Sequence, residues 1–335
     1  MSAAASTWDA LRVEGRSEAG WHLRRIHPDA PCEMYAGLRQ PDGVQGLIVE
    51  AAAEAVPSDI DLPRSRGFSL DAQLAGPSHG GKVRFTLALI DPAYQNVFAV
   101  LCDNVAEAAA AAPTSRAGLR EWLRQLLVWQ EFMARYGPGG LSDEAALGLV
   151  GELLMLRDEL APRLGYAAAI VSWAGPRGEP NDFEFAGGFL EIKTTSRQAP
   201  DAFRIANLDQ LDDRRGPILI ACVRLRADQS GMTLPSLVSD LRRRLSGVSS
   251  QSAADFDARL MAAGFVDIHA PLYPTAWVVT RIDFYQVREG FPRLTRRDVP
   301  SGVQSCSYSV TIADCAPYLS AGTSLDQVIG TSLDG

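Results

Sequence analysis

The stretch Pro180-Asn-Asp-Phe-Glu-Phe-Ala-Gly-Gly-Phe-Leu-Glu-Ile-Lys-Thr-Thr195 decides how the second half of this chain folds. Polar and apolar residues alternate on both sides of Gly187-Gly188, the pattern of two half-buried strands. Gly-Gly is a favoured two-residue hairpin turn, because glycine adopts positive φ without strain. The sequence therefore predicts a hairpin with one apolar face and one charged face. The apolar face carries Phe183, Phe185, Leu190 and Ile192, and the charged face carries Asp182, Glu184, Glu191 and Lys193.

The predicted register brings like charges together. Glu184 lies opposite Glu191, and like charges on adjacent strands destabilise a sheet. Asp182 lies opposite Lys193, which is a pair of opposite charges. A divalent cation such as Mg²⁺ (or Mn²⁺) would relieve this repulsion, since it prefers hard carboxylate oxygens. A neighbouring ammonium suits a site that orients water or neutralises charge on a phosphate. The alternation alone also fits an ordinary amphipathic hairpin with a solvated Asp182–Lys193 pair.

Lysine is rare in this chain. Its 335 residues include 32 lysines and arginines, and only Lys82 and Lys193 are lysines. Arginine is broader than a compact ammonium, so the lysine two residues after Glu191 indicates a pocket that needs one. Lys82 ends a GxxxxGK stretch that begins at Gly76, but Val83 stands where a phosphate-binding loop has Ser or Thr, and a strand pattern follows. We interpret residues 76–82 as a polar hairpin loop.

The remaining pattern indicates a β-rich start followed by alternating helices and strands. Strands are predicted over 21–26, 46–51, 67–70, 83–90, 96–102, 167–173, 218–225, 276–287 and 305–311. Helices are predicted over 105–112, 116–136, 142–160, 207–214 and 234–245, with one more after 253. A break at 137–140 precedes the helix that begins after Ser142, and Glu152 interrupts the apolar run of that helix. Its carboxylate either lies at the edge of the stripe or reaches into a site.

Composition excludes several classes of protein. The net charge of −8 disfavours a protein that coats nucleic acid. Five scattered cysteines without CxxC spacing argue against a disulfide framework and a structural zinc site. Apolar runs stay well below the ~20 residues that a bilayer requires. The first residues lack a basic region followed by an apolar stretch. We therefore expect a soluble cytoplasmic protein without a membrane partner.

Four segments carry a family resemblance: Gly148-Leu-Val-Gly-Glu-Leu-Leu154, Pro180-Asn-Asp-Phe-Glu184, Leu190-Glu-Ile-Lys-Thr-Thr195 and Asn207-Leu-Asp-Gln-Leu211. Together they resemble the PD-(D/E)XK nuclease superfamily, and within it a bacterial family of PD-(D/E)XK motif proteins of unknown function. The motif would be Asp182 with Glu191-Ile192-Lys193. One departure is Asn181, which stands between Pro180 and the aspartate; the proline contributes no ligand, so the departure is tolerated.

The resemblance implies an α/β (α+β) architecture with a restriction-endonuclease-like core, a mixed sheet flanked by helices. We expect a β-rich N-terminal domain over 1–115, this core over 116–250 and a β-containing C-terminal extension over 251–335. The resemblance also implies site roles. Asp182, Glu191 and the Ile192 carbonyl would bind Mg²⁺ (or Mn²⁺), and Glu152 would complete the metal shell. Lys193 would act on the attacking water or the phosphate, and Gln210 would orient the site.

The implied function is Mg²⁺-dependent DNA endonuclease activity. The family occurs in restriction-like phage-defence gene clusters, so the expected partners are DNA, ATPase and methyltransferase subunits, and a second copy of the chain as a homodimer. The alternative is a catalytically silent nuclease fold that binds DNA or holds partner subunits, and the net acidity motivates it. The arginine clusters at 214–215 and 242–244 fit either phosphate contacts or solvated helix ends.

Overall fold

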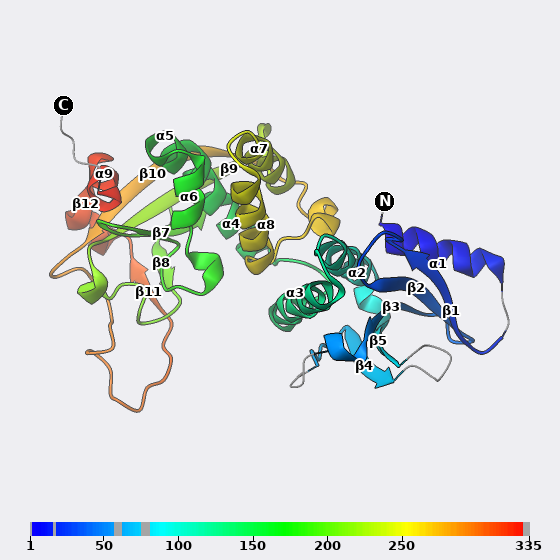
Figure 1. Cartoon of the computed structure of the whole chain (residues 1–335). Coiled ribbons are helices and arrows are strands. Elements are labelled where there is room, and N and C mark those ends of the chain that lie inside the picture. Colours follow the sequence, from blue (N-terminus) through cyan, green and yellow to red (C-terminus); the bar gives the residue numbers. More distant parts are fainter. Residues whose placement is uncertain (1, 16–17, 57–61, 75–80, 331–335) are drawn as a thin grey trace. The chain divides into compact units, whose positions relative to one another are not determined.

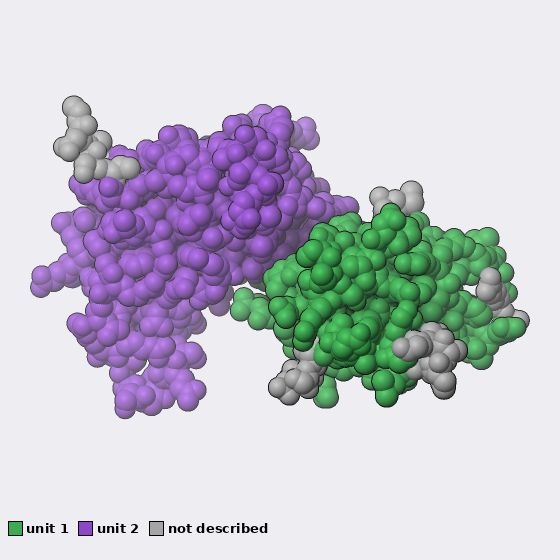
Figure 2. Space-filling view, in the orientation of Figure 1, with its two compact units in different colours: residues 1–139 green, residues 140–335 purple. Residues whose placement is uncertain are grey.

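The computed structural model describes residues 2–15, 18–56, 62–74 and 81–330. The chain divides into two compact units, residues 1–139 and 140–335 (Figures 1 and 2). The division falls at the break predicted over 137–140, and it differs from the predicted domain limits after residues 115 and 250. None of the helices in the described ranges is both long enough and apolar enough to cross a membrane.

A five-stranded antiparallel sheet covered by helices makes up the described part of the first unit. Its strand order is β1 (Gly20–Ile26), β2 (Glu33–Gln40), β3 (Val44–Ala52), β5 (Lys82–Leu89) and β4 (Phe68–Leu74). Helix α1 (Ala3–Glu14) packs on β1 and β2, and α3 (Ser115–Arg135) packs on β3 and on α2 (Gln95–Ala110). Trp122 of α3 contacts Phe85 of β5 edge to face. Because α3 buries its apolar stripe here, it belongs to this unit and not to the second domain as predicted.

Residues 96–102 form part of helix α2, so the predicted strand is wrong. The buried residues of α2 recur with helical spacing over the whole helix, but seven residues are too few to show that period. These residues are Val97, Phe98, Leu101, Cys102, Val105, Ala106 and Ala109. The strands over 21–26, 46–51, 67–70 and 83–90 and the helix over 116–136 are confirmed, whereas α1 and β2 were not predicted.

Lys82 is the first residue of β5, and its Nζ lies 2.8 Å from Oε2 of Glu33. A strand follows it, as predicted. Residues 75–80 of the predicted polar loop lie outside the described residues.

The described part of the second unit centres on a five-stranded mixed sheet, which confirms the predicted mixed sheet flanked by helices. The strand order is β6 (Phe183–Phe185), β7 (Gly188–Thr195), β9 (Ile218–Thr233), β10 (Ala276–Val287) and β12 (Leu319–Ser320). Strands β7 and β9 run parallel, and the other neighbours are antiparallel. Strand β10 pairs with β9 along its length. Residues beyond 250 therefore contribute strands to the core sheet itself and are not an extension packed on it.

Two layers cover this sheet. Helix α4 (Asp143–Met155) packs on β7, and α7 (Leu234–Ser246) packs on β9 and on α8 (Ser250–Ala262). Ile218, Ile220 and Cys222 of β9 belong instead to a core that includes residues of β8 (Ala202–Ile205) and β11 (Tyr308–Thr311), which form a two-stranded ribbon. Helix α9 (Thr323–Ile329) contacts β7 and β9.

Some predicted elements of this unit are wrong. Residues 167–173 were expected as a strand, but α6 (Tyr166–Ser172) is a helix, in keeping with the helix propensity of its three alanines. The predicted helix over 207–214 is a series of turns that ends in the 3₁₀ turn Asp213–Arg215. The helix over 142–160 is confirmed, as α4 and the π-helical turn Leu156–Leu160, with α5 (Ala161–Leu164) continuing it.

Candidate active site

The β6–β7 hairpin is offset by two residues from its predicted register. Phe183 pairs with Leu190 and Glu184 pairs with Phe189, so the turn is Ala186-Gly187. The side-chain period of two keeps Asp182, Glu191 and Lys193 on a common face, as predicted. Glu184, however, does not lie opposite Glu191. The predicted repulsion between these two residues is wrong, and Glu184 forms an ion pair with Arg215.

The two glycines of this hairpin serve close packing. A Cβ on Gly187 would lie 2.6 Å from the carbonyl oxygens of Gln327 and Val328. A Cβ on Gly188, which has a φ of +153°, would overlap the carbonyl oxygen of Pro217. Adjacent glycines favour a turn and a close approach alike, which explains the error in the predicted register.

Asp182 lies just before β6, beside the stretch of β7 that this short strand does not cover. Its backbone oxygen accepts hydrogen bonds from the N–H groups of Ala174 (2.8 Å) and Gly175 (3.0 Å). Its Oδ2 accepts one from the N–H of Ile192 at 2.7 Å. In an antiparallel pattern the N–H and C=O of one residue point to the same side of the strand. The Ile192 carbonyl is therefore directed toward the Asp182 side of β7.

Glu191 is buried, with 1% of its surface exposed, and both of its carboxylate oxygens accept hydrogen bonds. Lys193 Nζ and Gln210 Nε2 donate to Oε1, at 2.8 and 3.0 Å. Asn181 Nδ2 donates to Oε2 at 3.2 Å. The alternative of a solvated amphipathic hairpin is therefore wrong. We call Asn181, Asp182, Glu191, Lys193 and Gln210 the Glu191 cluster.

Gln210 holds the cluster together from outside the sheet. Its Oε1 accepts hydrogen bonds from the N–H of Ala206 at 2.8 Å and from Lys193 Nζ at 3.4 Å. The Asn207 side chain accepts the N–H groups of Asp209 and Gln210, which fixes the turn. Arg293 adds hydrogen bonds to the Leu211 carbonyl and to Asp213. The turn that replaces the predicted helix thus presents Gln210 to the cluster.

Asn181 is the member of the cluster that the sequence did not predict. It is 2% exposed, and its Nδ2 also donates to the backbone oxygen of Gln210 at 2.8 Å. The sequence placed it only as a tolerated residue before Asp182. The available sequence signal was an amide side chain next to Asp182 in a motif segment. Nothing in the local pattern indicated Gln210 as its partner.

Glu152 is brought to β7 by a close helix–strand contact. A Cβ on Gly151 would overlap Thr194 Oγ1, so only glycine lets α4 lie this near the strand. Glu152 Oε2 accepts a hydrogen bond from the indole N–H of Trp173 at 2.7 Å. Its side chain therefore reaches inward, as one of the two sequence readings predicted.

The titratable groups influence one another. Burial and then the charge of Glu191 raise the pKa of Glu152 to about 7. Burial, with the charges of Glu191 and Glu152, raises the pKa of Asp182 well above its usual value. Burial alone would lower the pKa of Lys193, but the Glu191 carboxylate outweighs it and raises that pKa. Glu152, Asp182, Glu191 and Lys193 therefore lie within electrostatic reach of one another.

The donors of this region suit Mg²⁺ by their chemistry. Within the described residues, no group of three His, Cys, Asp or Glu side chains is placed to hold a metal ion. Mg²⁺ is commonly held by one or two carboxylates together with water and substrate oxygens, so a three-acid cage is not required. Burial, and then repulsion by Glu191 and Glu152, raises the pKa of Asp182, and a divalent cation would offset both by neutralising the carboxylates. Asp182, Glu191 and the Ile192 carbonyl are the hard oxygen donors available here.

The arginine clusters that the sequence left open are engaged in ion pairs. Arg214 pairs with Asp212 and Arg215 with Glu184. Residues 242–244 pair with carboxylates of α7, of α8 and of the turn at Asp267. These ion pairs support the interpretation of both arginine clusters as solvated surface charges and not as free phosphate contacts.

A comparison with protein families accounts for this arrangement. Residues 4–313 match a family model described as "Putative PD-(D/E)XK family member, (DUF4420)". The chain belongs to this family. The predicted PD-(D/E)XK resemblance is thereby confirmed, and it covers both units of the DUF4420 chain. Membership indicates a nuclease-type function. No curated protein and no solved structure matches the chain.

Proposed function

We propose that this DUF4420 protein is a Mg²⁺-dependent DNA endonuclease that hydrolyses phosphodiester bonds. The observation that carries the proposal is the Glu191 cluster, in which the only lysine of this unit lies 2.8 Å from a buried carboxylate. Asp182 lies beside it at the uncovered part of β7. Phosphodiester hydrolysis needs fixed positive charge near the phosphate and acidic oxygens for a cation.

Each residue has a role in this proposal. Asp182, Glu191 and the Ile192 carbonyl would hold Mg²⁺, which would polarise a phosphoryl oxygen when bound. Lys193 would place its ammonium against the attacking water or the phosphate. Gln210 keeps the Lys193 ammonium and the Glu191 carboxylate in a fixed orientation. Glu152 would complete the metal shell by moving toward the bound cation, because the described residues hold no three acidic side chains already placed around one ion. Its pKa of about 7 lets Glu152 exchange a proton for a cation near neutral pH.

The net charge of −8 supports action within a larger assembly. Proteins that bind DNA unaided usually present a basic face, and several arginines of this unit are already paired with carboxylates. We therefore propose that the chain is a subunit of a restriction or phage-defence system. ATPase and methyltransferase subunits would bring DNA to it.

The test is plasmid cleavage by the purified full chain in Mg²⁺, Mn²⁺ or EDTA, alone and with its genomic neighbours. We expect cleavage in Mg²⁺ or Mn²⁺ and a loss of at least about 100-fold in Lys193→Ala and Asp182→Asn. Lys82→Ala is the matched control, because it removes the other lysine, whose partner Glu33 lies in the first unit. Equal cleavage by wild type and Lys193→Ala would refute the proposal.

A second candidate function is a catalytically silent module that binds DNA or holds partner subunits. The observation in its favour is that both oxygens of Glu191 are engaged by donors of the chain itself. It predicts DNA binding that needs no divalent cation and no cleavage by the wild type with all partners supplied.

A further inference from the structure

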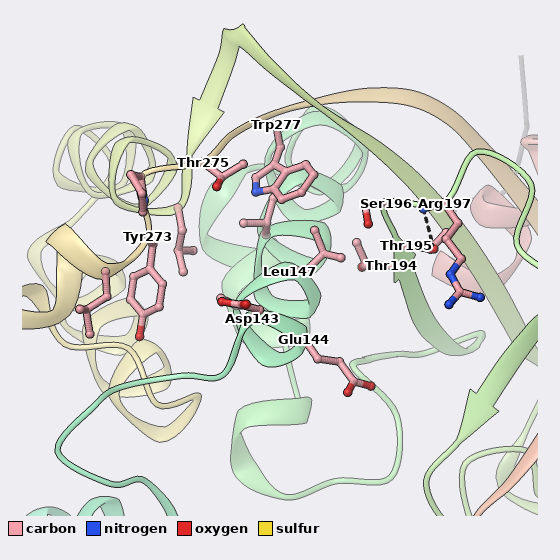
Figure 3. Close-up of a pocket in the computed structure, with 15 residues that line it drawn as sticks. Asp143, Glu144, Leu147, Thr194, Thr195, Ser196, Arg197, Tyr273, Thr275 and Trp277 are labelled. Carbon is pink, nitrogen blue, oxygen red and sulfur yellow. Dashed lines mark hydrogen bonds between the residues drawn. The ribbon is translucent and has the colours of Figure 1, made fainter.

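A second cavity adjoins the one that contains Lys193. The Lys193 cavity, about 630 Å³, is lined by Ile192, Lys193 and residues of β8. Its neighbour, about 600 Å³, lies between the start of α4, the end of β7 and the start of β10 (Figure 3). We call this neighbour the Trp277 pocket. The two cavities share a rim formed by Glu144, Thr194, Thr195 and Arg197.

The walls of the Trp277 pocket combine aromatic, apolar and acidic groups. Trp277 and Tyr273 line it together with Leu147 and Leu272, and the carboxylate of Asp143 lies among them (Figure 3). Its volume falls within the range of small-ligand sites, which are typically apolar with a few placed polar groups. Within the described residues, the exposed Asp143 forms no ion pair and the Trp277 indole N–H has no hydrogen-bond partner. Both are therefore available to a ligand.

The position of Trp277 is fixed by the sheet. Trp277 pairs with Ala227 of β9, and a Cβ on Gly231 would overlap the carbonyl oxygen of Trp277. Tyr273 is anchored as well, because its hydroxyl accepts a hydrogen bond from the N–H of Leu141 at 2.7 Å. The backbone of Trp277 and the side chain of Tyr273 are thus held in place before any ligand binds, which lowers the entropic cost of binding.

The charges of the pocket select the kind of ligand. Asp143 and Glu144 give its lining two carboxylates against one arginine, although Glu144 also pairs with Arg204 at 3.6 Å, so a phosphate is disfavoured inside it. Arg197 forms no ion pair within the described residues and stands on the shared rim, where its backbone N–H donates to Thr195 Oγ1 at 3.1 Å (Figure 3). A phosphate would lie at Arg197, and a flat, uncharged group would enter the pocket.

We propose that the Trp277 pocket binds a nucleobase that carries an exocyclic amino group, as cytosine and adenine do. Indole rings stack on bases, and carboxylates accept hydrogen bonds from exocyclic amino groups. The inference rests on the proposed function in one respect: a DNA strand at the Lys193 cavity would supply the base. Enzymes that carry out chemistry on a base extrude the nucleotide into such a pocket, and here the pocket would hold an unstacked base beside the phosphodiester. A free nucleoside is the other source with the same chemistry.

The experiment measures equilibrium binding to the full chain in EDTA, so that no cleavage occurs. The probes are labelled single-stranded oligo-dC and oligo-dT and the free nucleosides deoxycytidine and thymidine. We expect Trp277→Ala to weaken oligo-dC binding about 10-fold and Trp277→Phe to retain most of it, because base stacking on an aromatic ring contributes on this scale. Asp143→Asn should remove the preference for dC over dT. Val279→Ala, two residues along β10 and outside the pocket lining, is the matched control.

The outcomes separate this inference from the proposed function. Oligo-dC binding much tighter than deoxycytidine binding identifies the DNA strand as the source, whereas equal affinities identify a free nucleoside. Equal binding of every probe by wild type and Trp277→Ala would overturn the inference. The proposed nuclease function would then still be decided separately, by the plasmid cleavage experiment. Trp277-dependent nucleoside binding without any DNA binding or cleavage would uphold the pocket and reject the proposed nuclease.

Discussion

Gln210 and Lys193 donate to the same oxygen of Glu191, at 3.0 and 2.8 Å, from a turn and from a strand. Gln210 also accepts a longer hydrogen bond from the Lys193 ammonium, so the three side chains form a closed ring of contacts. Buried polar networks of this kind fix side-chain orientation when every member is satisfied. Gln210 thus positions the ammonium that we assign to the phosphate.

Gln210→Ala should lower the cleavage rate about 10-fold and destabilise the protein by about 1–2 kcal/mol, because it removes a donor to a buried carboxylate. Asp209→Asn is the control from the same turn. It weakens only an exposed ion pair with Arg296, and such pairs contribute little. Cleavage kinetics and chemical denaturation measure both effects. A loss of stability without a loss of rate would show that Gln210 has only a structural role.

The sequence predicted which ionisable residues come together but not how. The alternation of the strand pattern placed Asp182, Glu191 and Lys193 on one face of the sheet. A register shift of two residues keeps them on that face, because side chains alternate with a period of two. The register itself depended on contacts of Gly187 and Gly188 with segments distant in sequence, at Val328 and Pro217. Local alternation carries no information on such contacts.

The role of Asn181 was hidden for a similar reason. Its partner Gln210 lies in a turn that was predicted as a helix, so the amide network was not foreseeable from local periodicity. Likewise, the packing of α3 on the first sheet and the pairing of β10 with β9 placed the domain limits differently from the predicted ones, because long-range burial overrides segment patterns.

Glu152→Gln should stabilise the protein at pH 8 while it abolishes cleavage. Burial raises the pKa of Glu152 from 4.5 to about 7, so the folded state binds its proton more tightly than the unfolded state does. The free energy of unfolding therefore falls as pH rises from about 4.5 to 7, and a neutral side chain avoids this loss. The gain at pH 8 is up to about 3 kcal/mol, from 1.36 kcal/mol per pKa unit. Denaturation at pH 5 and pH 8 tests this, and a variant less stable than wild type at pH 8 would contradict it.

Cleavage should decline as pH falls below about 7. Glu152 and Asp182 have raised pKa values, so protons compete with the cation for these carboxylates in that range. The rate is expected to drop about 10-fold per pH unit if one proton must leave. A higher Mg²⁺ concentration should shift the midpoint of the profile to lower pH. Rates measured between pH 5.5 and 8.5 at two Mg²⁺ concentrations decide this, and a profile that does not move with Mg²⁺ would argue against metal–proton competition.

Gly151→Ala should destabilise the protein by about 1–3 kcal/mol, although alanine is the better helix former. The added Cβ would overlap Thr194 Oγ1 and lie 2.9 Å from Thr194 Cβ, which pushes α4 away from β7. Gly148→Ala, in the same helix with no atom within 4 Å of the added Cβ, should instead stabilise by up to about 1 kcal/mol. Adding Thr194→Ala to Gly151→Ala should restore part of the loss in a double-mutant cycle. Additive effects of the two substitutions would rule out the direct contact.

Lys193→Arg should abolish cleavage although it preserves the charge. The Lys193 side chain is 16% exposed and meets a Glu191 side chain that is 2% exposed, so the space around the ammonium is limited. A planar guanidinium is wider and directs its donors in a fixed fork, so it would displace Gln210 or lose contact with Glu191 Oε1. Lys82→Arg provides the contrast, because Lys82 and Glu33 are each 35% exposed and the surface leaves room for the larger group. We expect a rate loss of at least about 100-fold for Lys193→Arg, near that of Lys193→Ala, and wild-type activity for Lys82→Arg. Cleavage by Lys193→Arg at the wild-type rate would show that position 193 supplies charge alone, and the near absence of lysine from the chain would then carry no information about its chemistry.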